Sequence, residues 1–174
     1  MSSGTRPRDA SASRVVELLL NNGVTHAVWL VDTETASMYR ALLDAERSAR
    51  LTIVPVCREG EAIAVALGLQ MGGSKPVVII QSTGLFESGD SLRGQAIDLQ
   101  MPLVMLIGYR GWKPDPNLVA DSAARYLEPV LDAYGIRHWT LSSDTVETVL
   151  VAALAEAEGR PGPVAVLAPS DWQA

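Results

Sequence analysis

The chain has 174 residues, a length that suits one domain with a sizeable core, and 48% of its residues are hydrophobic. Its 14 basic and 20 acidic residues give a net charge of −6, which argues against a nucleic-acid-binding surface. No apolar run approaches the roughly 20 residues that cross a bilayer, so we expect no membrane partner. Cys57 is the only cysteine, which rules out an internal disulfide and favours a cytoplasmic setting.

The first thirteen residues (MSSGTRPRDASAS) are polar and lack the apolar segment of a signal peptide, so we expect a flexible tail over residues 1–13. Ser13 can cap the helix that follows. Periodicity predicts helices over residues 14–22 and 36–45, from Glu59 onward, and over 86–99, 125–134 and 145–158. Strands are expected over residues 25–31, 51–56, 77–81, 103–108, 137–141 and 164–167.

This alternation predicts one α/β domain over residues 14–174, a doubly wound and mostly parallel sheet with helices on both faces. Ligands of such sheets bind at the carboxyl ends of the strands, around the turns into the next helices. The turns to examine are residues 32–35, 57–61, 82–85 and 109–116.

Glu59 opens a helix whose residues 62–69 are all apolar or small, so this helix must be covered on every side. We expect the preceding strand (LTIVPV) to be buried and another subunit to cover the far side of the helix. Burial would raise the pKa of the Glu59 carboxyl group toward the range useful for proton transfer. The spacing is equally compatible with a capping role, in which a helix N-terminus stabilises a negative charge by about 0.3–1 kcal/mol.

Several other site types lack their signatures. Neither G-x-G-x-x-G after the first strand nor G-x-x-x-x-G-K-[ST] occurs, which removes the usual support for nucleotide binding. A hydrolase triad using Ser82 lacks the G-x-S-x-G turn. His26 and His138 are isolated and have no metal-ligand spacing, so we expect both to be structural.

Four segments, in order, resemble one enzyme superfamily. Residues 57–62 (CREGEA), with Gly68 nine residues after Glu59, resemble the catalytic-glutamate helix in the pyrimidine-binding domain of thiamine diphosphate enzymes. The other three resemble segments of sulfopyruvate and phosphonopyruvate decarboxylases. These are residues 23–35 (GVTHAVWLVDTET), 75–85 (KPVVIIQSTGL) and 101–111 (MPLVMLIGYRG).

The resemblance implies the cofactor and the residues that bind it. In that family a glutamate hydrogen-bonds a ring nitrogen of the cofactor's aminopyrimidine and favours its imino tautomer, which removes a proton from the thiazolium carbon. Glu59 matches this residue and is the expected catalytic group. Val31 and Asp32 match the turn that touches the pyrimidine edge, and Thr83 and Gly84 match the turn beside it.

The resemblance gives weaker guidance on the substrate, for which the candidates are Thr33, Phe86, Glu87 and Arg110. Related decarboxylases tend to have glycine and asparagine where Phe86 and Glu87 stand, so substrate choice can differ here. Arg110 offers a cation for a substrate anion, although an ordinary surface charge is the alternative.

The G-D-G…N signature that holds magnesium in these enzymes is missing. Gly89–Ser91 with Asn117 imitates it, but within an expected helix. The resemblance therefore implies the alpha subunit of a split 2-oxo-acid decarboxylase, which has no metal ligands of its own. A beta subunit would supply the Mg²⁺ and diphosphate site in a hetero-oligomer. The alternatives are a thiamine-dependent carboligase subunit of the acetolactate synthase type, or a non-catalytic α/β binding or regulatory subunit in which Glu59 only caps a helix.

Overall fold

The strands of the computed structural model, which describes residues 7–118 and 121–169, form one sheet. The order across the sheet is β2-β1-β3-β4-β6-β5, and every pair of neighbours is parallel. The strands are β1 (His26–Trp29), β2 (Thr52–Pro55), β3 (Pro76–Gln81), β4 (Leu103–Tyr109), β5 (Arg137–Thr140) and β6 (Pro163–Pro169). The predicted parallel α/β fold is confirmed.

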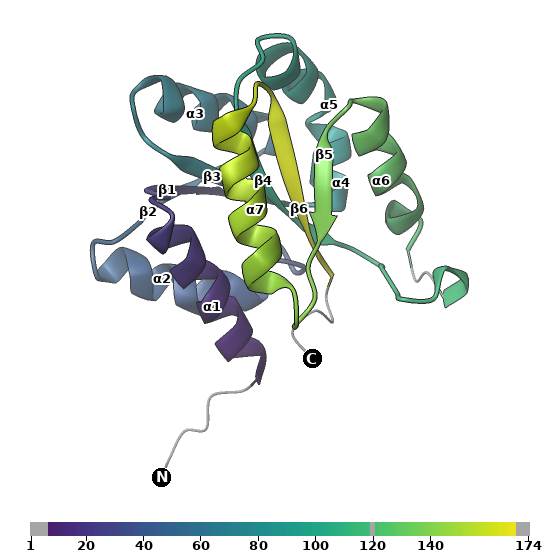
Figure 1. The fold of residues 1–174 in the computed structure, drawn as a ribbon, viewed down its shortest axis with the longest axis horizontal. Helices are drawn as coiled ribbons and strands as arrows, with labels where there is room; N and C mark the ends of the chain where they lie inside the picture. The colour runs from purple at the N-terminus through teal and green to yellow at the C-terminus, as the bar shows by residue number, and fades with distance from the viewer. Residues whose placement is uncertain (1–6, 119–120, 170–174) are drawn as a thin grey trace.

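Helices cover both faces of the sheet (Figure 1). One face carries α1 (Pro7–Asn21), α2 (Tyr39–Arg47) with the short η1 (Ala36–Met38), and α7 (Val146–Gly159). The other carries α3 (Glu59–Met71), α4 (Ser82–Glu87), α5 (Gly89–Ser91), the π-helix η2 (Leu92–Ile97) and α6 (Ala123–Ala133). Successive strand residues alternate between the two cores, so Ile79 packs with α1 and α2 while Ile80 packs with α3 and α4.

The burial of each strand follows its place in the sheet. Every residue of β4 and β6 is buried, as the continuous apolar runs predict for central parallel strands. The expectation that residues 51–56 form a buried strand is wrong, because β2 lies at the edge of the sheet and its four residues are exposed or half-buried. An edge strand has a neighbour on one side only, so side chains and backbone remain open to solvent.

Helix α1 begins at Pro7, so the expected helix start at Arg14 is wrong and Ser13 lies inside the helix instead of capping it. Ala12, Val15, Val16 and Leu19 form one apolar stripe at helical spacing, and none is more than 2% exposed. Burial of Ala12 in this stripe explains why the helix continues beyond the predicted start. Residues 1–6 lie outside the described residues.

The helix expected over residues 86–99 begins earlier, at Ser82, directly after β3. It runs in three pieces, α4, α5 and η2. Ser82, Thr83 and Gly84, predicted to form a turn, are the first helical turn instead. The Ser82 hydroxyl is fully buried, donates to the Gly108 carbonyl at 2.9 Å and accepts from the Arg110 N–H at 3.1 Å. Bonds to the neighbouring strand thus satisfy a serine that would otherwise favour a turn.

Candidate functional site

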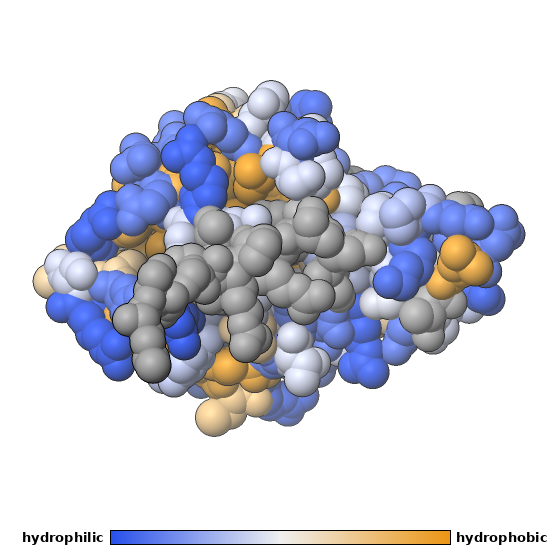
Figure 2. All heavy atoms as spheres, turned by 90° about the horizontal axis from the view of Figure 1, so that it is seen from below, coloured by the Kyte–Doolittle hydropathy of each residue, from blue (hydrophilic) through white to orange (hydrophobic). Residues whose placement is uncertain are grey.

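The strand order reverses between β1 and β3, because β2 lies on one side of β1 and β3 on the other. In open parallel sheets such a reversal leaves a crevice at the carboxyl ends of the two strands, where ligands bind. The turns after β1, β2, β3 and β4, all marked as candidates by the sequence, leave the sheet at this edge. Figure 2, seen from below the view of Figure 1, shows a mostly hydrophilic surface with separate hydrophobic patches.

Glu59 is the first residue of α3 and its side chain lies against the backbone of Gly84 in α4. A side-chain carbon at position 84 would lie 2.5 Å from Oε1 and 2.7 Å from Cδ of Glu59. Such distances are far inside van der Waals contact, so only glycine allows this approach. Glu59 itself is partly buried in the chain alone. The structure therefore joins two residues that the sequence placed in separate turns.

Glu87, three residues after Gly84, bonds to both sequence neighbours of Glu59. One bond goes to the Arg58 side chain and the other to the Gly60 backbone. Its Oε2 accepts from the Gly60 N–H at 3.0 Å, and its Oε1 accepts from Nε of Arg58 at 3.0 Å and from Nη2 of the same guanidinium. The Arg58 guanidinium, and after it the Gly60 N–H, lower the pKa of Glu87. Glu87 is thus ionised and already occupied by protein partners.

Asp32 shapes the turn after β1. Its Oδ1 accepts from the N–H groups of Glu34 at 2.8 Å and Thr35 at 2.9 Å, and its Oδ2 accepts from the Thr35 hydroxyl at 3.0 Å. The same hydroxyl accepts from Nε1 of the buried Trp29 at 3.0 Å. Burial raises the pKa of Asp32, although the bonds from Thr35 and Glu34 oppose that shift. Asp32 therefore holds its own turn in place.

A second close approach links the turns after β1 and β4. A side-chain carbon at Gly108 would lie 2.6 Å from Cβ of Glu34. Together with the Ser82 hydroxyl, which bonds Gly108 and Arg110, this contact ties three turns of the edge to one another. Sequence reasoning missed both Gly108 and the role of Ser82. The available signal was a glycine at the end of an otherwise apolar strand, where no turn requires it.

The remaining candidates lie around these turns. Val31 is 52% exposed. Thr33, which follows Asp32, and Thr83, in the first turn of α4, are also exposed. Phe86 is partly buried and packs against the core beneath α3 and α4. Arg110 donates from Nε to Oδ2 of Asp121 at 2.8 Å, so its charge is balanced within the chain.

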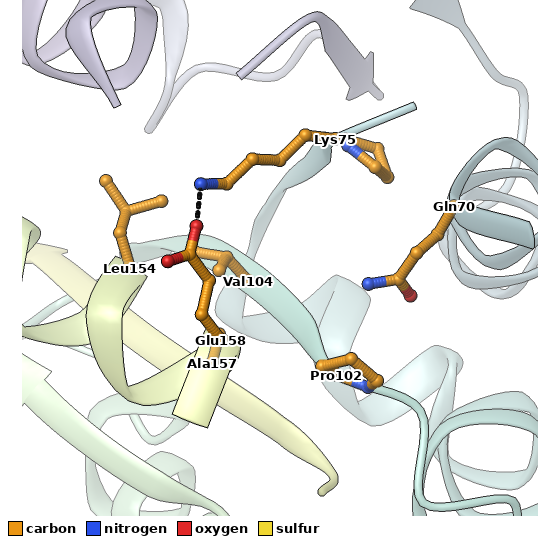
Figure 3. Close-up of a pocket in the computed structure, with 8 residues that line it drawn as sticks. Gln70, Lys75, Pro102, Val104, Leu154, Ala157 and Glu158 are labelled. Atoms are coloured by element: carbon orange, nitrogen blue, oxygen red, sulfur yellow. Dashed lines mark hydrogen bonds and ion pairs between the residues drawn. The ribbon is translucent and has the colours of Figure 1, made fainter. Parts of the chain in front are cut away.

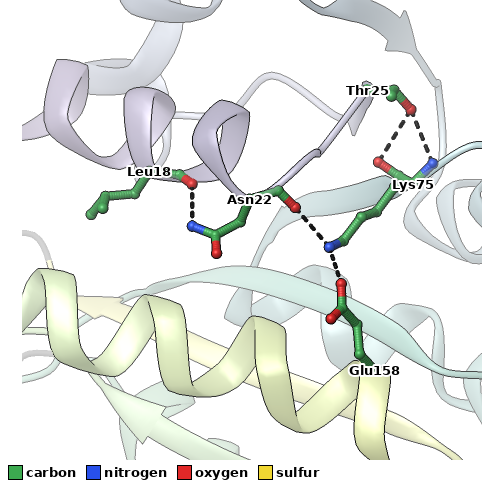
Figure 4. A network of polar contacts seen from close by, with 5 residues as sticks. All are labelled: Leu18, Asn22, Thr25, Lys75 and Glu158. Atoms are coloured by element: carbon green, nitrogen blue, oxygen red, sulfur yellow. Dashed lines mark hydrogen bonds and ion pairs between the residues drawn. The ribbon is translucent and has the colours of Figure 1, made fainter.

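The opposite, amino-terminal edge of the sheet has a pocket of about 250 Å³ (Figure 3). Its lining includes Lys75 and Glu158, and the Gln70 side chain points toward it from α3. The Lys75 ammonium group pairs with Glu158 and donates to the Asn22 carbonyl at 2.7 Å (Figure 4). These contacts tie α1, the start of β3 and α7 together, at the far edge of the sheet from Glu59.

Comparison with known proteins assigns the fold to a family. Residues 10–113 match the family model described as "Thiamine pyrophosphate enzyme, N-terminal TPP binding domain". The chain belongs to this family. The match covers more than half of the chain and includes β1 to β4, so it contains every candidate site residue named above.

The relatives of this thiamine pyrophosphate enzyme domain are named either as sulfopyruvate decarboxylases or as synthases. The chain is 22% identical to the sulfopyruvate decarboxylase of Methanosarcina acetivorans, over 92% of this chain and 41% of that protein. It is 24% identical to the sulfopyruvate decarboxylase subunit alpha of Methanocaldococcus jannaschii, over 56% of this chain and 57% of that one. It is 30% identical to the 2-succinyl-5-enolpyruvyl-6-hydroxy-3-cyclohexene-1-carboxylate synthase of Renibacterium salmoninarum, over 88% of this chain and 28% of that protein. The chain thus spans between about a quarter and three-fifths of the length of each of these relatives.

The residues at the carboxyl edge fit thiamine pyrophosphate (thiamine diphosphate). A carboxyl group at this edge could hydrogen-bond the cofactor's aminopyrimidine, and Glu59, partly buried against Gly84, supplies one. Among residues 7–118 and 121–169, no group of three or more histidine, cysteine, aspartate or glutamate side chains could hold a metal ion. In the same ranges, every helix is too short or too polar to cross a membrane.

Proposed function

We propose that this chain is the cofactor-activating alpha subunit of a split thiamine-diphosphate-dependent 2-oxo-acid decarboxylase. The observation that carries the proposal is the contact between Glu59 and Gly84 at the topological reversal of the sheet. Relatives named as an alpha subunit of sulfopyruvate decarboxylase support the split arrangement. A partner subunit would bring Mg²⁺ and the diphosphate site.

Glu59 is the catalytic residue of this proposal. Its carboxyl group would hydrogen-bond a ring nitrogen of the aminopyrimidine, and the backbone at Gly84 and Thr83 and the turn at Val31 and Asp32 would hold the ring. When bound, thiamine diphosphate supplies the nucleophilic carbon and the electron sink for cleavage beside a 2-oxo group. Exclusion of water by the partner would strengthen the hydrogen bond from Glu59.

The outer surface of α3 supports a partner that covers the helix. Ala64, Gly68 and Met71 lie on this surface at helical spacing, and Met71 is 80% exposed. No heavy atom lies within 4 Å of the place that a side-chain carbon at position 68 would take, so no neighbouring side chain covers this apolar surface there. We propose that the beta subunit packs here and completes the burial of Glu59.

Two features bear on the alternative in which Glu59 only caps a helix. The Ncap residue of α3, Arg58, makes no side-chain capping bond, and the Gly60 N–H is capped by Glu87 instead. The Glu59 carboxyl is therefore not needed for that donor. Thr33 and Arg110 stay proposed substrate contacts, and Phe86 is proposed to limit the size of the substrate beside α4.

A carboligase is the second candidate function. The 2-succinyl-5-enolpyruvyl-6-hydroxy-3-cyclohexene-1-carboxylate synthases match over 88% of this chain at 30–31% identity, which is higher than the identity to the decarboxylases. Assaying one 2-oxo acid alone and then with a second 2-oxo acid separates the two. Carbon dioxide with an aldehyde product supports the decarboxylase, and a hydroxyketone or hydroxy acid adduct supports the carboligase.

The test is co-expression with a partner that carries G-D-G…N. Thiamine diphosphate binding, the circular dichroism band of the imino tautomer and carbon dioxide release are measured for the pair. Glu59→Gln is expected to abolish the band and to lower kcat by about 100-fold or more, since it removes the proton that the carboxyl group shares. Glu61→Gln is the matched control, because Glu61 is an exposed glutamate of the same helical turn and accepts from the Cys57 N–H. Equal turnover of the Glu59→Gln and wild-type pairs contradicts the proposal.

A further inference from the structure

We propose that Glu87 is a positioning residue for Glu59, holding the first turn of α3 from α4; this role rests on the function proposed above. The Glu87 carboxylate bonds Arg58, which precedes Glu59, and Gly60, which follows it. It therefore fixes the chain on both sides of the proposed catalytic residue. We refer to Arg58, Glu87 and the Gly60 N–H as the α3 clasp.

The Gly60 half of the clasp satisfies a donor that the helix leaves open. The first N–H groups of any helix lack intrahelical acceptors, and at the start of α3 no side-chain bond comes from the Ncap residue. Glu87 supplies the acceptor at 3.0 Å, although it lies 27 residues away in the sequence. A bond between an ionised acceptor and a helix N-terminus is one of the stronger local restraints on a helix end.

The Arg58 half acts through geometry more than through charge. The Arg58 side chain is 76% exposed and that of Glu87 is 32% exposed, so the ion pair gains little from attraction in water. Two donors of one guanidinium, Nε and Nη2, reach the same Oε1. This leaves Oε2 directed at the Gly60 N–H, and the second half of the clasp is thereby aligned.

Tight packing at Gly60 supports the same role. A side-chain carbon at position 60 would lie 2.9 Å from Oγ of Ser91 and 3.6 Å from Oε2 of Glu87. The first turn of α3 thus lies directly on α4 and α5. Gly84 and Glu87 are three residues apart and share one side of α4. One helical surface therefore sets the backbone of α3 through Glu87 and the side chain of Glu59 through Gly84.

The first measurement is amide hydrogen exchange on the full chain without partner or cofactor, in wild type, Glu87→Ala, Glu87→Gln and Asp90→Ala. Glu87→Ala is expected to speed exchange at Gly60 by about tenfold or more, because it removes a charged acceptor. Glu87→Gln keeps an acceptor oxygen and should show a smaller increase. Asp90→Ala is the matched control, since it removes a carboxylate of an exposed ion pair with Arg93 in the same segment. Unchanged Gly60 exchange in Glu87→Ala overturns the clasp.

The second measurement uses the reconstituted pair. Glu87→Ala is expected to lower kcat and the imino circular dichroism band together by about tenfold. The dissociation constant for thiamine diphosphate should stay within about threefold of wild type, because Glu87 acts on Glu59 and not on the cofactor. Glu87→Gln should restore most of kcat, and Asp90→Ala should match wild type.

The outcomes separate this inference from the proposed function. If Glu59→Gln abolishes turnover while Glu87→Ala retains the wild-type kcat, the positioning role is wrong and the proposed function stands. If Glu87→Ala weakens cofactor binding as much as it lowers kcat, Glu87 contacts the cofactor and the positioning role is again wrong. If Glu59→Gln is fully active, the proposed function fails and takes the positioning role with it.

Discussion

The Oε1 atom of Glu59 lies 2.5 Å from the point where a side chain at Gly84 would begin. The carboxyl group thus occupies space that only a glycine leaves open. Because Gly84 is in α4 and Glu59 opens α3, the position of the carboxyl group depends on how these two helices pack.

Gly84→Ala is expected to displace Glu59 and to lower kcat of the reconstituted pair by about 100-fold, since small misplacements of a reacting group cost that much. Overpacking should also cost about 1–3 kcal/mol in the free energy of unfolding. Kinetics and urea denaturation check the two effects. Gly94→Ala is the control, because position 94 lies in η2 with nothing within 4 Å of a new side-chain carbon. A Gly84→Ala pair with wild-type kcat would remove the steric argument for Glu59.

Asp32→Asn tests the polar turn after β1. Burial raises the pKa of Asp32 above its ordinary value of 3.8, so the folded chain binds this proton more tightly than the unfolded chain does. The contribution of Asp32 to the free energy of unfolding therefore falls as pH rises from below 3.8 to above the raised pKa. Asparagine keeps an acceptor oxygen for the N–H groups of Glu34 and Thr35, loses the acceptor for the Thr35 hydroxyl, and does not titrate.

The measurement is the free energy of unfolding of both proteins across that pH range. We expect the stability of Asp32→Asn relative to wild type to increase as pH rises through the window and then to level off. A difference that is constant with pH, or that falls, contradicts the stated cause of the shift.

Gly68→Arg tests whether a partner covers the outer surface of α3. In the isolated chain the arginine meets open space, and replacing a helical glycine should stabilise the chain by about 0.5–1 kcal/mol. In the pair, a long cation on a covered apolar surface should weaken association by at least about tenfold. Thermal unfolding of the chain and titration of the pair are both needed.

Gly159→Arg is the control for that experiment. Gly159 ends α7 on the other side of the sheet, is exposed, and likewise has nothing within 4 Å. Normal assembly of the Gly68→Arg variant would show that the partner binds elsewhere.

Lys75→Met tests the independence of the two edges of the sheet. The change removes the ion pair to Glu158 and the bond to the Asn22 carbonyl, so the unfolding temperature should fall by about 2–4 °C. Activity of the pair at a temperature well below unfolding should stay within about twofold of wild type, because Lys75 is at the far edge. A large loss of kcat with unchanged stability would place the amino-terminal pocket in the function.

Local patterns predict the strands, most of the helices and the start of α3. Glu59 was predicted correctly as the first residue of its helix because a strand, a polar turn and a small apolar run follow one another without a gap. The start of α4 over residues 82–85 was missed because serine, threonine and glycine favour turns locally. The bonds that override this preference come from Gly108 and Arg110, which only the sheet brings near.

The same limit applies to the candidate site. Glu87 was predicted as a substrate residue because it follows the turn nearest the expected cofactor, and its contacts with Arg58 and Gly60 were not predicted. Nothing in the sequence pairs residues 27 apart on two different helices. The order of residues along the chain indicated which turns form the site. The packing of α3 against α4 determines which of their residues are in contact.

Cys57, the one cysteine of the sequence, is exposed and stands two residues before Glu59. A thiol-reactive fluorophore or spin label can therefore be attached there without first removing other cysteines. Docking of a second subunit over this edge would change the mobility and solvent access of such a label. The native thiol thus offers a direct optical or magnetic readout of assembly in the unmutated chain.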